Sequence, residues 1–335
     1  MKIGVVGLPN VGKSSLFNLL THAHAQVAKF PFTTIDRNIG MVHVPDERLD
    51  RIVEILNPPK VKYAQIEFVD IAGLIQGASQ GDGLGNKFLA HIRDVDLILH
   101  VLRCFSREDI PHTDDTIVPR RDYDIVRTEL LLSDLIITER RIDKIKKRTE
   151  CKEEHTQLQA IRESLSQGLV PEITVPDLPL LSVKREIIVL NMDEEGTFTS
   201  DIDGYRMSVK LEEDIVDFSD AERRELRIDA GVDERGLSGL ITTCLQTLSI
   251  ILFYTIKGEE TRAWPITKGT KISDAAGMIH TDMKEGFIKA EVLGYDDFLD
   301  AQGFTAAQHA GKTHIEGKDY RVQDGDIILI RFRAK

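Results

Sequence analysis

A glycine-rich loop near the start of the chain has the residue types and the spacing that bind phosphate. Residues 7–14, GLPNVGKS, match the pattern GxxxxGK[S/T] at every fixed position, with an apolar run before them and a helix-forming run after them. The glycines let backbone N–H groups approach a β-phosphate, the helix N-terminus attracts the anion, and Lys13 can reach the β- and γ-phosphates. We therefore predict that nucleotide is bound by Asn10, Val11, Gly12, Lys13, Ser14 and Ser15.

Three side chains are predicted to bind Mg²⁺ beside this loop. The Ser14 hydroxyl follows the loop lysine, and Asp70 ends a predicted strand, where a carboxylate can hold Mg²⁺ through water. Thr34 lies in FPFTT, between the loop and that strand, where a γ-phosphate sensor belongs; capping of a local turn is the alternative role for this threonine. Gly73 closes the run DIAG and can offer its backbone N–H to the γ-phosphate. We predict catalytic roles for Lys13 and Gly73.

The elements that must position these residues indicate a parallel α/β sheet, because short apolar runs alternate with helical stretches. Strands are predicted at residues 2–6, 66–70, 96–102, 187–190 and 205–209, and helices at 221–227 and 237–253. Between residues 123 and 167 apolar residues recur every three to four positions among many charges, which predicts a long amphipathic helix or an antiparallel pair.

The chain is predicted to divide into three parts. Past residue 262, short strands in AWPIT, GFIKAEVL, DYRV and IILIRF are separated by Gly and Asp turns, which is typical of a small mixed domain. We predict a nucleotide domain at residues 1–122 and 183–258, an inserted helical arm at 123–182, and a C-terminal domain at 259–335. A basic run from Arg140 to Arg148 on the arm has two interpretations, an rRNA contact or a solvated helix face.

Composition excludes several classes of protein. The formal net charge is -12, which disfavours binding to DNA or to an anionic membrane by the molecule as a whole. The three cysteines are far apart and form no CxxC pair, which argues against disulfides or a zinc site and fits a reducing cytosol. No apolar run approaches the roughly 20 residues of a membrane span, and the N-terminus is too polar for a signal peptide. We expect a cytoplasmic protein.

Several runs together closely resemble the YchF family, in the Obg-related branch of P-loop NTPases. They are GLPNVGKSSLFN, FPFTTIDRN, FVDIAGLIQGASQGDGLGNKFLAHIRD, VLRCF, NMDEEG, AAGMIHTDMKEGFIKAEV and EGKDYRVQDGDI. The resemblance covers nearly the whole chain except the helical insertion and residues 165–185. It implies a P-loop nucleotide domain, an inserted α-helical coiled-coil arm, a C-terminal ubiquitin-like β-grasp (TGS) domain, association with ribosomes, and a preference for ATP over GTP.

The predicted base pocket departs from that of guanine-specific relatives. Those use Asn-Lys-x-Asp, whose carboxylate pairs with guanine, whereas this chain has Asn191, Met192, Asp193 and Glu194. Asn191 can still bond the purine, Met192 replaces the lysine stem that packs on the base, and Glu194 is one methylene too long for the guanine pair. These changes weaken GTP binding without selecting adenine, so the ATP preference rests on the resemblance. We predict that Asn191, Met192 and Glu194 contact the base.

The residues that activate water are also unusual. Leu74 follows DIAG where many GTPases place a glutamine that orients the attacking water, and leucine cannot hydrogen-bond water. His112 matches a histidine that the family carries after its RCF motif and is our candidate catalytic replacement; an exposed loop histidine is the alternative. Asn10 occupies the position where related NTPases bind an activating K⁺, and a purely structural role is equally open.

Taken together, the sequence predicts a ribosome-associated, Mg²⁺-dependent ATPase that releases ADP and phosphate and works as a nucleotide-dependent switch. Two alternatives stay open. One is a GTP-specific GTPase of the same fold. The other is a nucleotide-binding switch whose hydrolysis is negligible without a partner, which the missing glutamine motivates.

Overall fold

The computed structural model describes residues 1–23, 39–71, 84–107, 109–112, 116–146, 152–195, 198 and 200–333. The chain forms two compact units, Met1–Val42 with Glu67–Leu240, and His43–Ile66 with Ile241–Lys335. The predicted limits of the three domains remain a prediction. The structure shows one feature that the sequence did not suggest: residues 43–66 belong to the same compact unit as the C-terminal part of the chain.

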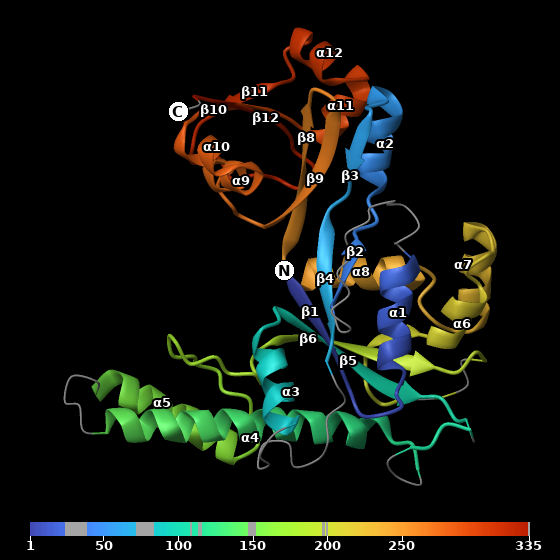
Figure 1. Ribbon diagram of the computed structural model, residues 1–335, viewed down its shortest axis with the longest axis vertical. Coiled ribbons are helices and arrows are strands. Elements are labelled where there is room, and N and C mark those ends of the chain that lie inside the picture. Colours follow the sequence, from blue (N-terminus) through green and yellow to red (C-terminus); the bar gives the residue numbers. More distant parts are fainter. Residues whose placement is uncertain are drawn as a thin grey trace. The chain divides into compact units, whose positions relative to one another are not determined.

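The sheet of the first unit has the strand order β2-β4-β1-β5-β6-β7 (Figure 1). Its strands are β1 (Lys2–Val6), β2 (Ile39–His43), β4 (Gln65–Asp70), β5 (Leu97–Cys104), β6 (Arg185–Met192) and β7 (Tyr205–Met207). Strand β1 is parallel to β4 and β5, β5 is parallel to β6, and β6 is parallel to β7. The five predicted strands are confirmed, except that the fifth ends at Met207 and not at Val209, which begins a helix capped by Ser208. Because these strands are parallel, the segments after β1, β4, β5 and β6 meet at one edge of the sheet, where such folds bind ligands.

Helices α1 (Lys13–Ala23) and α3 (Leu84–Arg93) lie between strands of this sheet. Helices α6 (Val209–Asp214), α7 (Asp220–Asp229) and α8 (Gly236–Thr247) follow its last strand, β7. The prediction of helix up to residue 253 was wrong, because α8 ends at Thr247 and strand β8 (Ile250–Lys257) follows. Ser249 turns the chain with a positive φ of 56°, and the β-branched and aromatic run after it pairs with the next strand.

Two consecutive helices form the inserted arm, α4 (Pro119–Ile145) and α5 (Lys152–Ser166), which lie side by side as an antiparallel pair (Figure 1). Their contact buries apolar residues of both helices, among them Ile142, Leu158 and Ile161. Asp134 of α4 is fully buried and accepts hydrogen bonds from the backbone N–H groups of Leu181 and Ser182, at 2.8 and 2.7 Å. The predicted helical pair is confirmed. No helix in the described ranges has both the length and the apolarity that a membrane crossing demands.

The second unit is built on a mixed sheet with the order β11-β10-β12-β8-β9-β3. Its other strands are β9 (Glu260–Thr267), β10 (Phe287–Leu293), β11 (His314–Glu316), β12 (Ile327–Phe332) and β3 (Lys60–Lys62), and its helices are α2 (Glu47–Leu56), α9 (Ile272–Ile279), α10 (Thr281–Glu285), α11 (Tyr295–Ala301) and α12 (Phe304–His309). The strand predicted in DYRV was wrong, because only Arg321 forms an isolated bridge there. Asp326 instead holds a turn, in which it accepts hydrogen bonds from Tyr320 Oη and from the N–H of Gln323.

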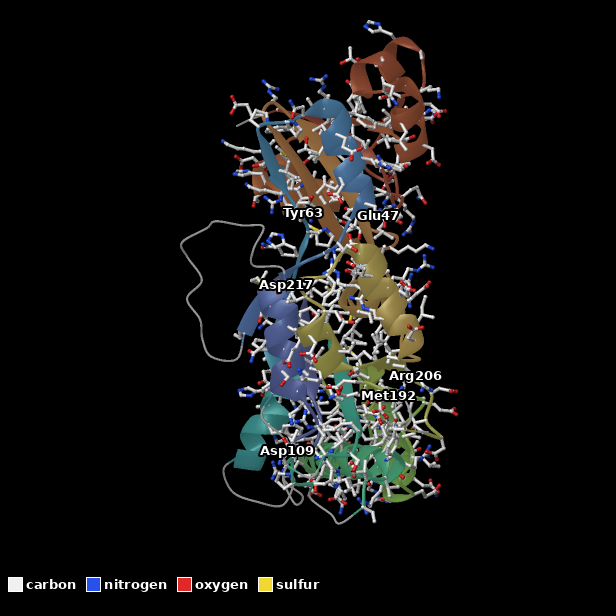
Figure 2. All side chains as sticks on the ribbon, turned by 90° about the vertical axis from the view of Figure 1, so that its right-hand side faces the viewer. Glu47, Tyr63, Asp109, Met192, Arg206 and Asp217 are labelled. Carbon is white, nitrogen blue, oxygen red and sulfur yellow. The ribbon has the colours of Figure 1, made fainter. Side chains whose placement is uncertain are left out.

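Residues 43–66 join this second sheet through a strand and a helix. Strand β3 pairs in parallel with the start of β9, and α2 packs against β9. Asp46 caps α2 by accepting from Leu49 N–H at 3.2 Å, and its carboxylate also accepts from the buried hydroxyl of Tyr254 at 3.0 Å. Arg48 makes a bidentate ion pair with Asp324, with both N···O distances at 3.0 Å. Figure 2 labels two residues of this segment, Glu47, the first residue of α2, and Tyr63, which follows β3.

Candidate nucleotide-binding site

Two glycines of the loop between β1 and α1 have backbone angles that other residues adopt only with strain. The φ angles of Gly7 and Gly12 are 150° and 98°. A Cβ atom at Gly7 would lie 2.4 Å from the carbonyl oxygen of Val101, and one at Gly12 would lie 2.4 Å from Asn191 Nδ2. The loop therefore packs tightly on β5 and β6, and the fixed glycines of the motif are explained by these contacts.

Lys13 begins α1 and is folded back over this loop. Its side chain is buried, and Nζ donates a hydrogen bond to the carbonyl oxygen of Leu8 at 2.6 Å. Burial lowers the pKa of Lys13 to about 8, and the negative charge of Asp70 opposes that shift. Burying the positive charge of Lys13 costs desolvation free energy, and the attraction of a bound phosphate would offset that cost.

Ser14 and Asp70 lie together as predicted for a Mg²⁺ site. Ser14 Oγ donates to Asp70 Oδ2 at 2.9 Å. Asp70 Oδ1 is buried and has no hydrogen-bond partner among the described residues. An unmatched carboxylate oxygen beside a hydroxyl is a donor set that fits Mg²⁺, which prefers oxygen ligands. The predicted Thr34 and Gly73, and also Leu74, lie outside the described residues.

Asn191, at the end of β6, supports the loop with both ends of its amide. Nδ2 donates to the carbonyl oxygen of Val11 at 2.9 Å, and Oδ1 accepts from the N–H of Val209 at 3.0 Å. The side chain is buried. Asn191 thus ties the phosphate loop to the start of α6. A bond to the purine would use the second hydrogen of Nδ2 or the second lone pair of Oδ1, and that predicted role stays a prediction.

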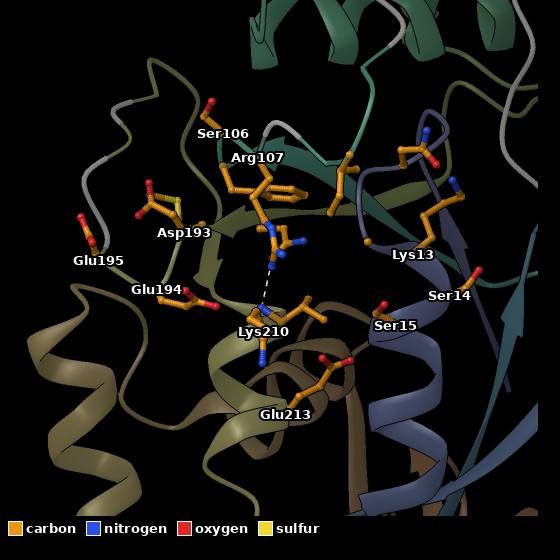
Figure 3. Close-up of a pocket in the computed structure, with 17 residues that line it drawn as sticks. Lys13, Ser14, Ser15, Ser106, Arg107, Asp193, Glu194, Glu195, Lys210 and Glu213 are labelled. Atoms are coloured by element: carbon orange, nitrogen blue, oxygen red, sulfur yellow. Dashed lines mark hydrogen bonds between the residues drawn. The ribbon is translucent and has the colours of Figure 1, made fainter.

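These elements surround a cavity of about 780 Å³, within the range of small-molecule sites (Figure 3). Its lining includes eight of the nine predicted nucleotide-binding residues: Asn10, Gly12, Lys13, Ser14, Ser15, Asn191, Met192 and Glu194. The ninth, Val11, is buried and contributes its carbonyl to Asn191. The structure therefore brings the phosphate loop and the predicted base pocket to the same hollow.

The cavity also has lining residues that the sequence reasoning missed. They follow β5, β6 and β7: Phe105, Ser106, Arg107, Ile110, Asp193, Glu195, Val209, Lys210 and Glu213. The signal that could have found them is their place directly after parallel strands, at the same edge as the phosphate loop.

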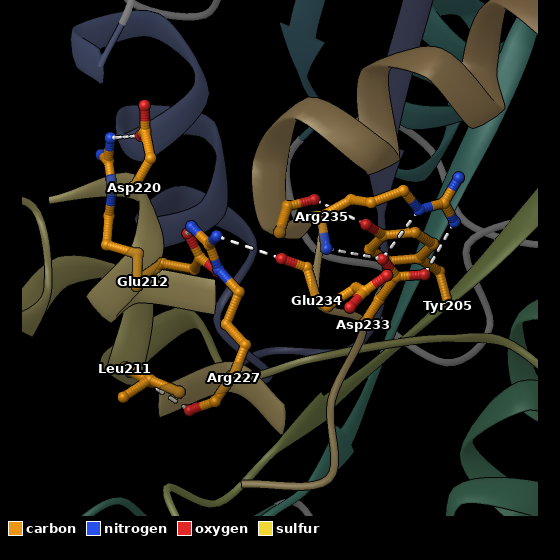
Figure 4. A network of polar contacts seen from close by, with 11 residues as sticks. Tyr205, Leu211, Glu212, Asp220, Arg227, Asp233, Glu234 and Arg235 are labelled. Atoms are coloured by element: carbon orange, nitrogen blue, oxygen red, sulfur yellow. Dashed lines mark hydrogen bonds and ion pairs between the residues drawn. The ribbon is translucent and has the colours of Figure 1, made fainter. Parts of the chain in front are cut away.

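Polar contacts fix helix α6, which contributes Val209 and Lys210 to the cavity. Ser208 caps the helix by accepting from the N–H of Leu211. Glu212 of α6 forms a bidentate, largely buried ion pair with Arg227 of α7, at 2.7 and 2.9 Å (Figure 4). Such geometry favours a fixed orientation of both side chains.

His112 is not brought to the cavity in the described part of the chain. Its Nε2 lies 2.9 Å from Oδ2 of Asp122, in the first turn of α4, and its side chain is only 5% exposed. In this arrangement His112 faces the arm. The predicted role in positioning water stays a prediction.

Comparisons with known proteins agree with this geometry. Residues 2–132 match the family model described as 50S ribosome-binding GTPase, and residues 250–333 match YchF-GTPase_C, described as a protein of unknown function. The chain is 40% identical over 360 residues to the Ribosome-binding ATPase YchF of Pasteurella multocida, with 99% of both chains covered, and 39% identical over 361 residues to that of Bacillus subtilis, again with 99% of both covered.

Solved structures have the same fold. The YchF GTPase of Schizosaccharomyces pombe superposes with a TM-score of 0.84 at 32% identity, covering 99% of this chain and 97% of the other. A GTP binding protein from Pyrococcus horikoshii superposes with a TM-score of 0.62 at 19% identity, covering 99% of this chain and 100% of the other, which shows the fold alone.

Proposed function

The chain belongs to the YchF family of P-loop nucleotide hydrolases, and from that premise we propose that it binds ATP with Mg²⁺, hydrolyses it to ADP and phosphate, and acts as a nucleotide-dependent switch on the ribosome. The observation that carries the proposal is the cavity that joins the phosphate loop to the end of β6. The predicted TGS-like nature of the C-terminal domain belongs to the same proposal.

The phosphate end of the cavity supports hydrolysis. Lys13 would stabilise charge on the β- and γ-phosphates, with the loop N–H groups around it. Ser14 and Asp70 would hold Mg²⁺, with Thr34 and Gly73 completing the site from outside the described residues. When bound, Mg²⁺ neutralises charge shared by the β- and γ-phosphates. Asn10 would be the K⁺ ligand if the ion activates; its Nδ2 already donates to Pro111 O at 3.1 Å, which leaves its oxygen for a cation.

The base end supports ATP over GTP. Met192 is buried and lines the cavity where guanine-specific relatives place a lysine, and Glu194 is exposed at the cavity edge. A longer, exposed acid holds the bidentate guanine pair poorly. The curated relatives are named ATPases, which favours the same substrate.

Ribosome association rests on the relatives, which are named for ribosome binding, and on a basic surface of the arm. Arg140 and Lys144 of α4 and Lys146, the residue that follows the helix, are exposed, which suits contact with rRNA phosphates. Arg141 of the same run is instead paired with Glu154 of α5 at 2.7 Å.

A specific observation favours the reading in which a partner controls hydrolysis. His112 is held against Asp122 and is not among the described residues that line the cavity, so we infer that a change at the arm brings its ring to the nucleotide. Turnover measured with and without ribosomes tests this alternative: a large rise supports a partner-gated switch, and equal rates count against it.

The test of the main proposal is equilibrium binding of fluorescent ADP and GDP analogues in the presence of Mg²⁺. We expect ADP to bind at least tenfold tighter, about 1.4 kcal/mol. Tighter GDP binding would return the protein to the GTP-specific class. Lys13→Ala should abolish ATP turnover, whereas Lys271→Ala, in an exposed ion pair of the C-terminal unit, should leave it unchanged; normal turnover in Lys13→Ala would refute the assignment.

A further inference from the structure

One wall of the nucleotide cavity is a loop between β5 and the arm. We call residues 105–112, apart from residue 108, the wall loop. It contributes Phe105, Ser106, Arg107 and Ile110 to the cavity lining, and α4 begins seven residues after it, at Pro119. The shape of the cavity therefore depends on what holds this loop.

A single buried cation organises the wall loop from within. Arg103, near the end of β5, is 1% exposed. Its guanidinium donates to four carbonyl oxygens, those of Phe105 at 3.1 Å, Arg107 at 3.4 Å, Ile110 at 3.0 Å and Pro111 at 3.3 Å. It also lies over the Phe105 ring, 4.5 Å from the centroid. A guanidinium has five N–H donors in a rigid plane, so four fixed acceptors hold the loop in one conformation.

The far end of the wall loop is attached to two other elements. The carbonyl oxygen of Pro111 also accepts from Nδ2 of Asn10 in the phosphate loop, at 3.1 Å. The next residue, His112, is bonded to Asp122 of α4, whose side chain is fully buried. Consecutive residues thus connect the phosphate loop to the first turn of a helix of 27 residues.

We propose that Asp122 is a positioning residue for nucleotide binding, which acts through His112 to hold the wall loop against the phosphate loop. Nucleotide affinity then depends on how α4 is seated, and a partner that moves the arm changes that affinity. The inference rests on the proposed function, since it takes the nucleotide as the ligand of the cavity. Burial strengthens the hydrogen bond between Asp122 and His112, because the local dielectric constant is low and water does not compete for the two side chains.

The first experiment measures the Kd of fluorescent ADP, with Mg²⁺, for Asp122→Ala and Asp122→Asn. We expect the Kd to rise at least fivefold in the alanine variant and less in the asparagine variant, which keeps a neutral acceptor for His112. The matched control is Asp134→Ala, which removes another buried carboxylate of α4. Its oxygens accept hydrogen bonds from the backbone N–H groups of Leu181 and Ser182, both far along the chain from the wall loop.

Asp134→Ala should lower the unfolding midpoint yet leave the Kd within twofold of wild type. Equal rises in Kd for the two alanine variants would show that Asp122 only stabilises the arm, and would overturn the proposal. Should Asp122→Ala fail to fold, the comparison is made between Asp122→Asn and Asp134→Asn with the same two outcomes.

The second experiment is a double-mutant cycle between Asn10→Ala and Asp122→Ala, read as ADP Kd. The two side chains contact neighbouring residues, Pro111 and His112, so coupling through the wall loop predicts a combined loss smaller than the product of the single losses. A combined loss equal to the product would refute transmission through the loop. If wild-type protein binds no ADP, the proposed function fails; if it does and Asp122→Ala binds equally well, only the positioning role fails.

Discussion

Asn191 offers a direct test of how the phosphate loop is supported. Replacement by alanine removes both of its hydrogen bonds, the one donated to Val11 O and the one accepted from Val209 N–H. Val11 and Val209 are 1% and 3% exposed, so water has little access to the two backbone groups that lose their hydrogen-bond partner. We expect Asn191→Ala to weaken the first unit as a whole and to loosen the phosphate loop.

The magnitude follows from these two backbone groups. A buried donor or acceptor left without a partner costs about 1–3 kcal/mol. The adjoining cavity lets some water approach from one side, so we place the total loss in the free energy of unfolding at about 2–4 kcal/mol. In a domain of 150–250 residues, 1 kcal/mol lowers the melting temperature by roughly 2–4 °C, which gives a fall of about 4–16 °C.

The assay combines urea unfolding with ADP titration. Glu195→Ala is the matched control, because Glu195 lines the same cavity and is exposed. We expect the control to unfold like wild type, and Asn191→Ala to lose both stability and ADP affinity. A variant that loses ADP affinity at unchanged stability would refute the supporting role and would assign Asn191 to the purine.

Two further predictions concern the phosphate end of the cavity. Burial lowers the pKa of Lys13 to about 8, and bound phosphate would raise that pKa again, so ADP binding should take up a proton above pH 8. The Kd of ADP, measured at constant ionic strength, should be constant below pH 8 and rise by up to tenfold per pH unit above it. A Kd that stays constant up to about pH 9.5 would contradict this prediction. Asp70→Asn keeps an acceptor for the Ser14 hydroxyl but removes the negative charge, so the Mg²⁺ concentration for half-maximal ATP binding should rise at least tenfold. ADP binding measured in excess chelator should stay as in wild type. An unchanged Mg²⁺ requirement would show that Asp70 does not bind the ion.

Sequence patterns predicted the part of the site that depends on local spacing. The motif at residues 7–14 sets the backbone geometry of a short loop, and an apolar run such as 2–6 identifies a strand even when the strands that pair with it are unknown. Parallel packing then places Asp70 and Asn191 beside the loop, because each ends its strand or nearly does so.

The wall of the cavity could not be predicted in the same way. Arg103 stands in a strand whose eight residues are all buried, and the sequence does not say which carbonyl oxygens meet its charge. A charged residue in such a strand does signal that acceptors must lie nearby. The end of α8 was missed for a related reason, since an apolar run beginning at Ile250 suits a buried helix or a strand, and pairing with β9 decides between them.

Because residues 43–66 fold with the C-terminal unit, they determine which fragments of the chain can fold. A fragment that starts at Ile250 would lack strand β3 at its sheet edge, and the hydroxyl of Tyr254 would lose its acceptor, Asp46. A deletion of the C-terminal unit would in turn leave α2 without β9, against which it packs, and would expose Leu49 and Ile52, now fully buried. The C-terminal unit is therefore not a detachable module. To keep the whole unit, a separate polypeptide needs both segments, and we expect residues 43–66 joined to residues 241–335 by a new linker to supply them.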